Sequence, residues 1–255
     1  WDKGDRNIYK NVKLLSNQDT YVSGTKRNYF ETSDIHGTVD FICGGGDVFF
    51  NDCLIYLENR SGNCVTANAS SSNWGYVFSN CIIDGFDINN GSYRLGRPWN
   101  GSPQTVFLNT TMKQLPTAEG WGDPMNVVPS VYAEYNSTTA SGGVVDLSSR
   151  RTSYTKDATT VTLNPVLSES QANSYTLENV LGGDDSWMPT YATEQVPAPA
   201  ITISGATINW DNSDYVLCWA VSKDGVFQEF VTTNSYAVPQ GTSDGVKYTV
   251  RAANE

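Results

Sequence analysis

The chain is poor in histidine and in positive charge. It contains one histidine, His36, which a Ser-His-Asp or Cys-His hydrolase would have to use, and we expect it instead at a turn before the strand that follows Gly37. Lysine and arginine number 16 against 27 acidic residues, which gives a net charge of −11. Because phosphate binding needs clustered Lys and Arg, nucleic acid is not an expected partner. No apolar run approaches the roughly 20 residues of a membrane span, so no such span is predicted.

Paired cysteines are also missing. The five cysteines include no Cys-x-x-Cys pair, which excludes a common zinc-binding pattern, and their odd number argues against a complete disulfide framework. We therefore expect small buried thiols rather than a structural zinc site. No signal peptide is visible and the chain opens at Trp1 without a methionine, which indicates a processed, trimmed or incomplete chain.

The chain is instead rich in aromatic residues and glycine, and its sequence contains a repeating pattern. Of the 255 residues, 39% are hydrophobic and 17% charged, and the 22 Gly, 14 Tyr and 7 Trp favour a β-rich protein with many turns. A pattern of one aromatic residue and, five positions later, one aliphatic residue recurs every 20 to 29 residues, starting at Tyr9, Phe30, Phe50, Phe78 and Phe107. That period is too short for a strand–helix–strand unit and is typical of one coil of a parallel β-helix.

Stacked coils place equivalent residues one strand spacing apart, about 4.8 Å. The leading aromatic residues should therefore form one ladder inside the coil. A second, aliphatic ladder should consist of Leu14, Ile35, Ile55, Ile83 and Met112. Cys53 and Cys81 occupy equivalent positions as well, and we expect their thiols to stack in the core.

Two acids share one position of this repeat. Asp40 lies in an apolar run bracketed by glycines, where a carboxylate must be paired, hydrogen-bonded or used in chemistry. Asp19 stands ten residues after Tyr9 and Asp40 ten residues after Phe30, which predicts that both side chains lie on one face of adjacent coils. Such a pair suits a division of labour between a nucleophile and a proton donor.

A cation and an aromatic ring come together in residues 95–99. Arg97 and Trp99 flank Pro98, which restricts the backbone between them. A guanidinium binds a carboxylate through two hydrogen bonds, and an indole face stacks on a sugar ring. The stretch therefore predicts a site for a carboxylate and a sugar, and the alternative is a surface loop with a packed Trp99.

The last third of the chain predicts a cap, a linker and a second domain. A helix is expected within residues 165–181, starting at Ser168, and with the closing segment 187–189 it should cover the open end of the coil. A Pro-rich linker at 196–199 separates domain 1–194 from domain 195–255. Strands are predicted over 206–210, 215–221, 226–232 and 246–252, with a turn at Asp224-Gly225. The second domain resembles a short fibronectin type III module, a small β-sandwich, so the predicted fold class is all-β.

Three sequence blocks resemble the signature blocks of the pectin methylesterase family. They are Gln18-Asp19-Thr20, the run 37–44 that contains Asp40 and Phe41, and the run 95–99 that contains Arg97 and Trp99. Gly120-Trp121 and residues 133–135 are similar to later blocks of the family. The resemblance covers roughly residues 5–190, and three blocks in the family's order make it specific.

The resemblance implies a fold, a reaction and a role for each block. The fold is a right-handed parallel β-helix, and the reaction is the hydrolysis of galacturonosyl methyl esters in pectin, with release of methanol and with no metal or cofactor. The implied catalytic residues are the nucleophile Asp40, the general acid and base Asp19, the oxyanion donor Gln18, and Arg97, which pairs with the nucleophile. The implied substrate-binding residues are Trp99, Phe41 and Trp121.

The resemblance also carries departures and leaves alternatives open. The family usually has phenylalanine where Cys43 stands, and a second oxyanion glutamine belongs to a coil upstream of Gln18. We therefore expect the first coils to be missing, and the chain to act as a monomer or together with a separate N-terminal fragment. Pectin, a polymer, implies a secreted, periplasmic or cell-surface location. The alternatives are a polysaccharide lyase or glycosidase that uses the same acids, and a non-catalytic pectin-binding or surface protein on the same scaffold.

Overall fold

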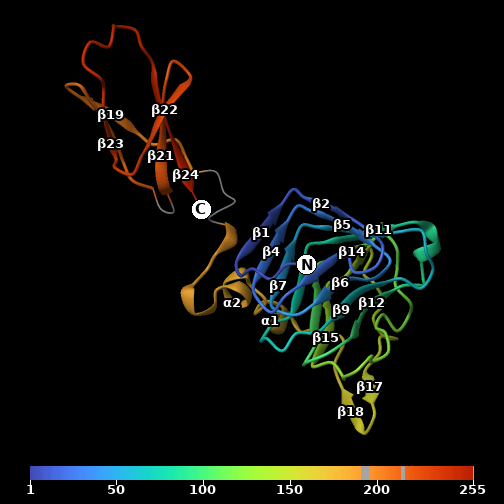
Figure 1. Ribbon diagram of the computed structural model, residues 1–255. Coiled ribbons are helices and arrows are strands. Elements are labelled where there is room, and N and C mark those ends of the chain that lie inside the picture. The colour runs from blue at the N-terminus through green and yellow to red at the C-terminus, as the bar shows by residue number, and fades with distance from the viewer. Residues whose placement is uncertain (191–195, 214–215, 255) are drawn as a thin grey trace. The chain divides into compact units, whose positions relative to one another are not determined.

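The repeats of the sequence form stacked coils whose strands build three parallel sheets (Figure 1), and the first four repeats each add one strand to every sheet. The computed structural model describes residues 1–190, 196–213 and 216–254, and the coils lie in the first of two units, Trp1–Trp187. Neighbouring strands in these sheets come from successive coils, which is the topology of a parallel β-helix. The predicted parallel coil is confirmed, whereas its right hand, the hand of nearly all parallel crossovers, stays a prediction.

The first sheet carries the aromatic ladder. Its strands, in spatial order, are β1 (Asn7–Lys10), β4 (Asn28–Glu31), β7 (Val48–Asn51), β10 (Tyr76–Ser79), β13 (Gln104–Leu108) and β15 (Val131–Tyr135). The register aligns Tyr9, Phe30, Phe50, Phe78 and Phe107, as the repeat predicts. Their rings stack with centroids 4.4 to 5.0 Å apart, so the ladder forms a continuous apolar column inside the coil.

One left-handed residue turns each coil from the first sheet toward the second. These residues lie two positions after each ladder aromatic, with φ between 48° and 55°, and are Asn11, Thr32, Asp52, Asn80 and Asn109. Asn and Asp tolerate this conformation better than other side chains because they can hydrogen-bond locally. The recurring Asn or Asp in the repeat is thus a backbone requirement of the turn.

The second sheet carries the aliphatic ladder. Its strands are β16 (Thr138–Thr139), β14 (Thr111–Met112), β11 (Ile82–Gly85), β8 (Leu54–Leu57), β5 (Asp34–Gly37) and β2 (Lys13–Leu15). The register aligns Leu14, Ile35, Ile55, Ile83 and Met112, which confirms the predicted ladder. Cys53 and Cys81 are buried free thiols, and they interact with each other as expected.

His36 does not lie in a turn, contrary to the prediction. It belongs to strand β5, is nearly buried, stacks on the Tyr56 ring, and approaches Glu58 Oε1 to 2.9 Å through Nδ1. Gly37 does not break the strand but is its last residue. The His36 side chain contacts Glu58 and Tyr56, and this gives it a structural position.

The third sheet is the shortest and carries the two acid-bearing segments. Its strands are β12 (Arg94–Pro98), β9 (Cys64–Asn68), β6 (Val39–Gly44) and β3 (Tyr21–Ser23). A 3-10 turn, η1 (Asp87–Asn89), precedes β12. Because all four strands are parallel, their N-terminal ends lie at the same end of the sheet. Residues at the start of β3 and β6 therefore lie side by side there.

The helical segment does not cap the end of the coil, which corrects a second expectation. It forms two short helices, α1 (Glu169–Ala172), capped by Ser168, and α2 (Leu177–Leu181), followed by η2 (Gly183–Asp185). Their apolar side chains join a cluster with the outward-facing residues of the first sheet, including Tyr29, Phe49 and Val77. The helices thus cover a lateral face, because one row of outward-facing residues in that sheet is apolar, namely Ile8, Tyr29, Phe49, Val77, Val106 and Ala133.

The far end of the core is completed by another segment. Val145 and Tyr154 are buried there, and the Tyr154 ring packs edge-on to Tyr132. Tyr154 belongs to a hairpin, β17 (Ser153–Lys156) and β18 (Thr159–Thr162), that follows the last coil. This hairpin and the loop before it therefore cover the end of the core for which the sequence predicts a helix.

The second unit, Met188–Glu255, contains two antiparallel sheets of three strands. One is β19 (Ile201–Ser204), β20 (Thr207–Trp210) and β23 (Ser235–Ala237), and the other is β22 (Val226–Val231), β21 (Val216–Lys223) and β24 (Tyr248–Asn254). Trp210 and Trp219 meet in their shared core with ring centroids 5.8 Å apart. The four predicted strands and the turn at Asp224-Gly225 are found, and β19 and β23 are strands that the sequence analysis did not predict.

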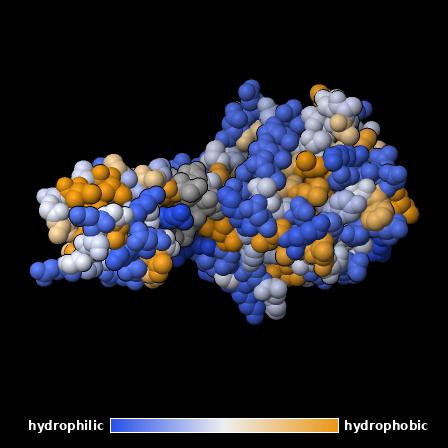
Figure 2. All heavy atoms as spheres, turned by 90° about the horizontal axis from the view of Figure 1, so that it is seen from above, coloured by the Kyte–Doolittle hydropathy of each residue, from blue (hydrophilic) through white to orange (hydrophobic). Residues whose placement is uncertain are grey.

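The boundary between the units comes slightly earlier than the expected 194/195 junction, which lies outside the described residues, as does residue 215 of a predicted strand. The fibronectin type III resemblance stays a prediction. None of the helices in the described ranges has the length and hydropathy needed to cross a membrane. In the view of Figure 2 hydrophilic residues cover most of the surface, with apolar patches between them.

Candidate active site

Asp40 is a buried acid on an irregular strand. It is the second residue of β6, only 5% exposed, with a left-handed backbone (φ 52°). The register between β6 and β9 shifts between Val39 and Ile42, so Asp40 lies in a β-bulge. A bulge redirects a side chain out of the regular alternation, and bulges are common beside active sites.

Arg97 holds the Asp40 carboxylate through both of its oxygens. Arg97 Nε donates to Asp40 Oδ1 at 2.8 Å, and Nη2 donates to Oδ2. This charge-assisted fork raises the pKa of Arg97. Arg97 lies on β12, two strands from Asp40, and the residue beside it on the intervening β9 is Ala67, whose small side chain leaves room for the guanidinium to cross.

The glycine before Arg97 is required by close packing. A Cβ at Gly96 would lie 2.1 Å from the Thr66 hydroxyl oxygen, so a larger residue would push β12 away from β9. The close approach of β12 to β9 at Gly96 therefore fixes the position of the Arg97 guanidinium relative to Asp40.

Asp19 occupies the position equivalent to Asp40 in the preceding coil. The register of β3 and β6 aligns Tyr21 with Ile42, which aligns Asp19 with Asp40 two positions earlier. Both acids share φ 52°, the left-handed conformation that few residues other than Asn, Asp and Gly adopt. Asp19 is exposed, unlike Asp40, and its neighbour Gln18 is also exposed at the same edge.

Two thiols lie beside the acids, and sequence reasoning did not assign either to the site. Cys43 Sγ lies 3.7 Å from Asp19 Oδ1, and burial followed by the charge of Asp19 raises the pKa of the Cys43 thiol to about 12. Burial, followed by the charge of Asp40, likewise raises the pKa of the Cys64 thiol. The sequence feature that points to Cys43 is its place in the same apolar run as Asp40.

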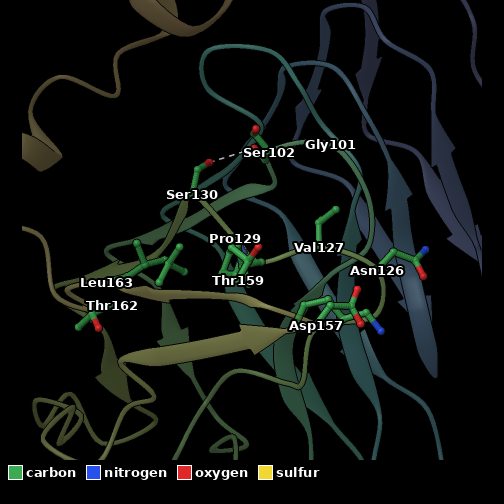
Figure 3. A pocket seen from close by; sticks show the side chains of 13 residues that line it. Gly101, Ser102, Asn126, Val127, Pro129, Ser130, Asp157, Thr159, Thr162 and Leu163 are labelled. Atoms are coloured by element: carbon green, nitrogen blue, oxygen red, sulfur yellow. Dashed lines mark hydrogen bonds between the residues drawn. The ribbon is translucent and has the colours of Figure 1, made fainter.

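Trp99 stands half-buried at the end of β12, next to a hollow. Its backbone N–H donates to Asn68 O at 2.9 Å, which continues the third sheet by one residue. A hollow of about 750 Å³ begins two residues later, lined by Gly101 and Ser102, the 126–130 loop and the β17–β18 hairpin (Figure 3). Ser130 Oγ donates to Ser102 O at 3.0 Å, which joins two of these loops.

The groups brought together have complementary chemistry. Asp40 is a buried carboxyl group that accepts two hydrogen bonds from a guanidinium, and a second carboxyl group is exposed in the adjacent coil. The first suits nucleophilic attack and the second suits proton transfer to and from a bound substrate.

Comparison with known proteins identifies the family of the chain. Residues 2–184 match the pectinesterase family. The chain belongs to the pectinesterase family. A probable pectinesterase/pectinesterase inhibitor 41 of Arabidopsis thaliana is 32% identical over 200 residues, covering 72% of this chain and 32% of that protein. The probable pectinesterase 8 of the same plant is 34% identical over 161 residues, covering 58% of this chain and 39% of its own.

Solved structures of pectin methylesterases are similar to the chain as well. Pectin methylesterase PemA from Erwinia chrysanthemi is similar with a TM-score of 0.57 and 32% identity, over 73% of this chain and 59% of its own. A pectin methylesterase in complex with hexasaccharide VII gives the same TM-score, identity and coverage. The chain thus spans about a third of the length of the curated relatives named first and less than two thirds of the solved ones.

Two of the predicted substrate-binding residues lie in the core of the coil instead. Phe41 and Trp121 are both fully buried among the ladder residues, and Trp121 stacks on Tyr132 with ring centroids 4.4 Å apart. A ring without exposed surface cannot contact a polysaccharide. Phe41 turns inward next to the bulge at Asp40, and the chain after Trp121 continues over it, so both residues support the site from beneath.

Proposed function

We propose that this pectinesterase hydrolyses the methyl esters of galacturonosyl residues in pectin and releases methanol. The observation that carries the proposal is the fork of Arg97 on the buried Asp40, with Asp19 at the equivalent position of the preceding coil. A carboxylate is a weak nucleophile unless it is oriented and partly desolvated, and the fork and the burial of Asp40 supply both conditions.

The proposed reaction has two steps. Asp40 attacks the ester carbonyl carbon, and the resulting oxyanion accepts a hydrogen bond from the Gln18 amide. Asp19 protonates the departing methoxide, which leaves an acyl-enzyme on Asp40. Asp19, now a carboxylate, takes one proton from water as the water attacks the acyl carbon. The bond between the acyl carbon and Asp40 breaks, the galacturonic acid leaves with the second water proton, and both acids return to their starting states. General acid–base help of this kind is typically worth about 10²–10⁴-fold, and one oxyanion donor about 10²–10³-fold.

Arg97 does not block the nucleophile. An ionised carboxylate has about four lone-pair sites, and the guanidinium fork uses one on each oxygen. A free site therefore remains on each oxygen of Asp40 for attack on the ester.

The proposed substrate is the polymer itself, bound by a monomer. Trp99 offers a half-exposed aromatic face for a sugar ring, and the hollow beyond it adds hydroxyl, amide and aliphatic groups for a neighbouring residue of the polymer. A polymeric wall substrate places the protein outside the cytoplasm, as a secreted, periplasmic or cell-surface protein.

One reaction separates this proposal from its alternatives. Highly methyl-esterified pectin is incubated with the protein, and methanol, reducing ends and unsaturated uronides are followed together. Methanol without the other two products supports the esterase. Reducing ends would indicate a glycosidase, unsaturated uronides a lyase, and the absence of all three would favour a pectin-binding protein.

The nucleophile is tested by substituting Asp40→Asn. We expect methanol release to fall roughly 10⁴-fold or more, because an amide cannot form the acyl intermediate. Asp52→Asn is the matched control, since Asp52 is exposed and has the same left-handed backbone but lies in a turn away from the third sheet. Near-normal turnover by the Asp40 variant would refute its role, whatever product the wild type forms.

A further inference from the structure

A single row of the third sheet approaches both acids. The register aligns Arg97 on β12 with Ala67 on β9 and Ala67 with Cys43 on β6. In a parallel sheet aligned residues point to the same face, so the guanidinium and the Cys43 thiol share one face with only a methyl group between them. Arg97 holds Asp40, and the thiol contacts Asp19.

The two acids are held very unequally. Asp40 is buried and receives two hydrogen bonds from Arg97. Asp19 is exposed, and within the described part of the chain its carboxylate accepts one hydrogen bond, from Cys43 Sγ at 3.7 Å. An exposed carboxylate with one weak bond would otherwise sample several rotamers, and catalysis by proton transfer needs one of them.

We propose that Cys43 is a positioning residue, whose thiol proton holds Asp19 Oδ1 so that Oδ2 faces the leaving methanol. The inference rests on the proposed function and assigns a role to a thiol that the esterase chemistry does not itself require. The thiol makes no covalent bond in the cycle, and its proton stays on sulfur throughout.

The chemistry of the thiol suits a donor and not a nucleophile. Cys43 is only 4% exposed, and burial together with Asp19 raises its pKa to about 12, so it is protonated at neutral pH. A protonated thiol is a weak hydrogen-bond donor and a poor nucleophile. The group can therefore orient Asp19 without competing with Asp40 for the ester.

The test compares three variants by kcat and KM for methanol release. Cys43→Ala removes the donor, Cys43→Ser keeps a donor, and Cys53→Ala removes a buried thiol that donates to a backbone carbonyl in the core. We expect Cys43→Ala to lower kcat about three- to ten-fold, the value of one modest hydrogen bond, with KM changed less than about two-fold. Cys43→Ser should restore most of kcat, because the exposed Asp19 can follow the shorter hydroxyl. Cys53→Ala should lower the melting temperature and leave kcat unchanged.

The outcomes that overturn the inference are distinct from those that overturn the esterase. An unchanged kcat in Cys43→Ala, or equal losses in Cys43→Ala and Cys43→Ser, would show that the thiol only fills space. In both cases methanol release by the wild type and its loss in Asp40→Asn would stand. A wild type that releases no methanol would overturn the proposed function and this inference with it.

Discussion

The aromatic ladder ends on a buried ion pair, and breaking this pair should destabilise the coil strongly. Glu134 on β15 aligns with Phe107, so it takes the next place in the ladder, and its side chain is 0% exposed. Arg150, with a side chain only 3% exposed, donates from Nε to Glu134 Oε1 at 2.6 Å. Ser137 Oγ donates to the other carboxylate oxygen at 2.9 Å, and Arg150 Nη1 also reaches Ala118 O at 3.1 Å.

The substitution Arg150→Met keeps most of the side-chain volume and removes the charge. Glu134 is then left as a buried carboxylate with one hydroxyl donor, which typically costs about 3–5 kcal/mol. That is a large share of the roughly 5–15 kcal/mol that stabilises a domain, and it corresponds to a fall in melting temperature of roughly 6–20 °C. The double variant Glu134→Leu with Arg150→Met should recover most of the loss, because an apolar pair of similar size fits the end of the ladder.

Calorimetry of the whole chain is the assay, since the coil and the second unit can melt separately. Arg151→Met is the matched control, because the neighbouring Arg151 pairs at 2.6 Å with Asp123, whose side chain is 89% exposed. An exposed pair is worth about 0–1 kcal/mol. Equal shifts for Arg150→Met and Arg151→Met would refute the reasoning, as would a double variant no more stable than Arg150→Met.

Two further predictions concern the aromatic residues and acid stability. Trp99→Ala should raise KM for pectin with little change in melting temperature, whereas Trp121→Ala should cost about 3–5 kcal/mol of stability; steady-state kinetics and thermal unfolding distinguish them, and the reverse pattern would exchange their roles. Arg27 binds Asp5 and Asp185, and its hydrogen bond lowers the pKa of Asp185 to about 2. Because that folded-state pKa is depressed, the stabilisation is present above about pH 4 and is lost as the pH falls toward 2, so the melting temperatures of wild type and Arg27→Gln should converge between pH 5 and pH 2. A difference that does not depend on pH would contradict this.

The sequence by itself determined the coil, the register and the alignment of the two acids. A parallel coil repeats its side-chain positions at fixed spacing, so a regular series from Tyr9 to Phe107 is enough to predict which residues stack. The same repeat aligns Asp19 with Asp40. The pairing of Arg97 with Asp40 is what the family resemblance implies, and the observed fork has the geometry with which a guanidinium binds a carboxylate.

Only the tertiary structure decided what lies beneath the site and what covers the coil. The family resemblance implies that Phe41 and Trp121 contact the substrate, but both are buried in the structure. Their burial depends on neighbouring coils and loops, which their own sequence segments do not determine. The thiol of Cys43 reaches Asp19 only because two strands distant in sequence lie side by side. The helices cover a lateral face because its outer residues are apolar, and the end of the ladder is closed by an ion pair, Glu134 with Arg150, whose members come together only when the last loop folds back. Local pattern thus determines a repeating core, and contacts between distant segments determine its surface and its ends, since those contacts depend on packing in three dimensions.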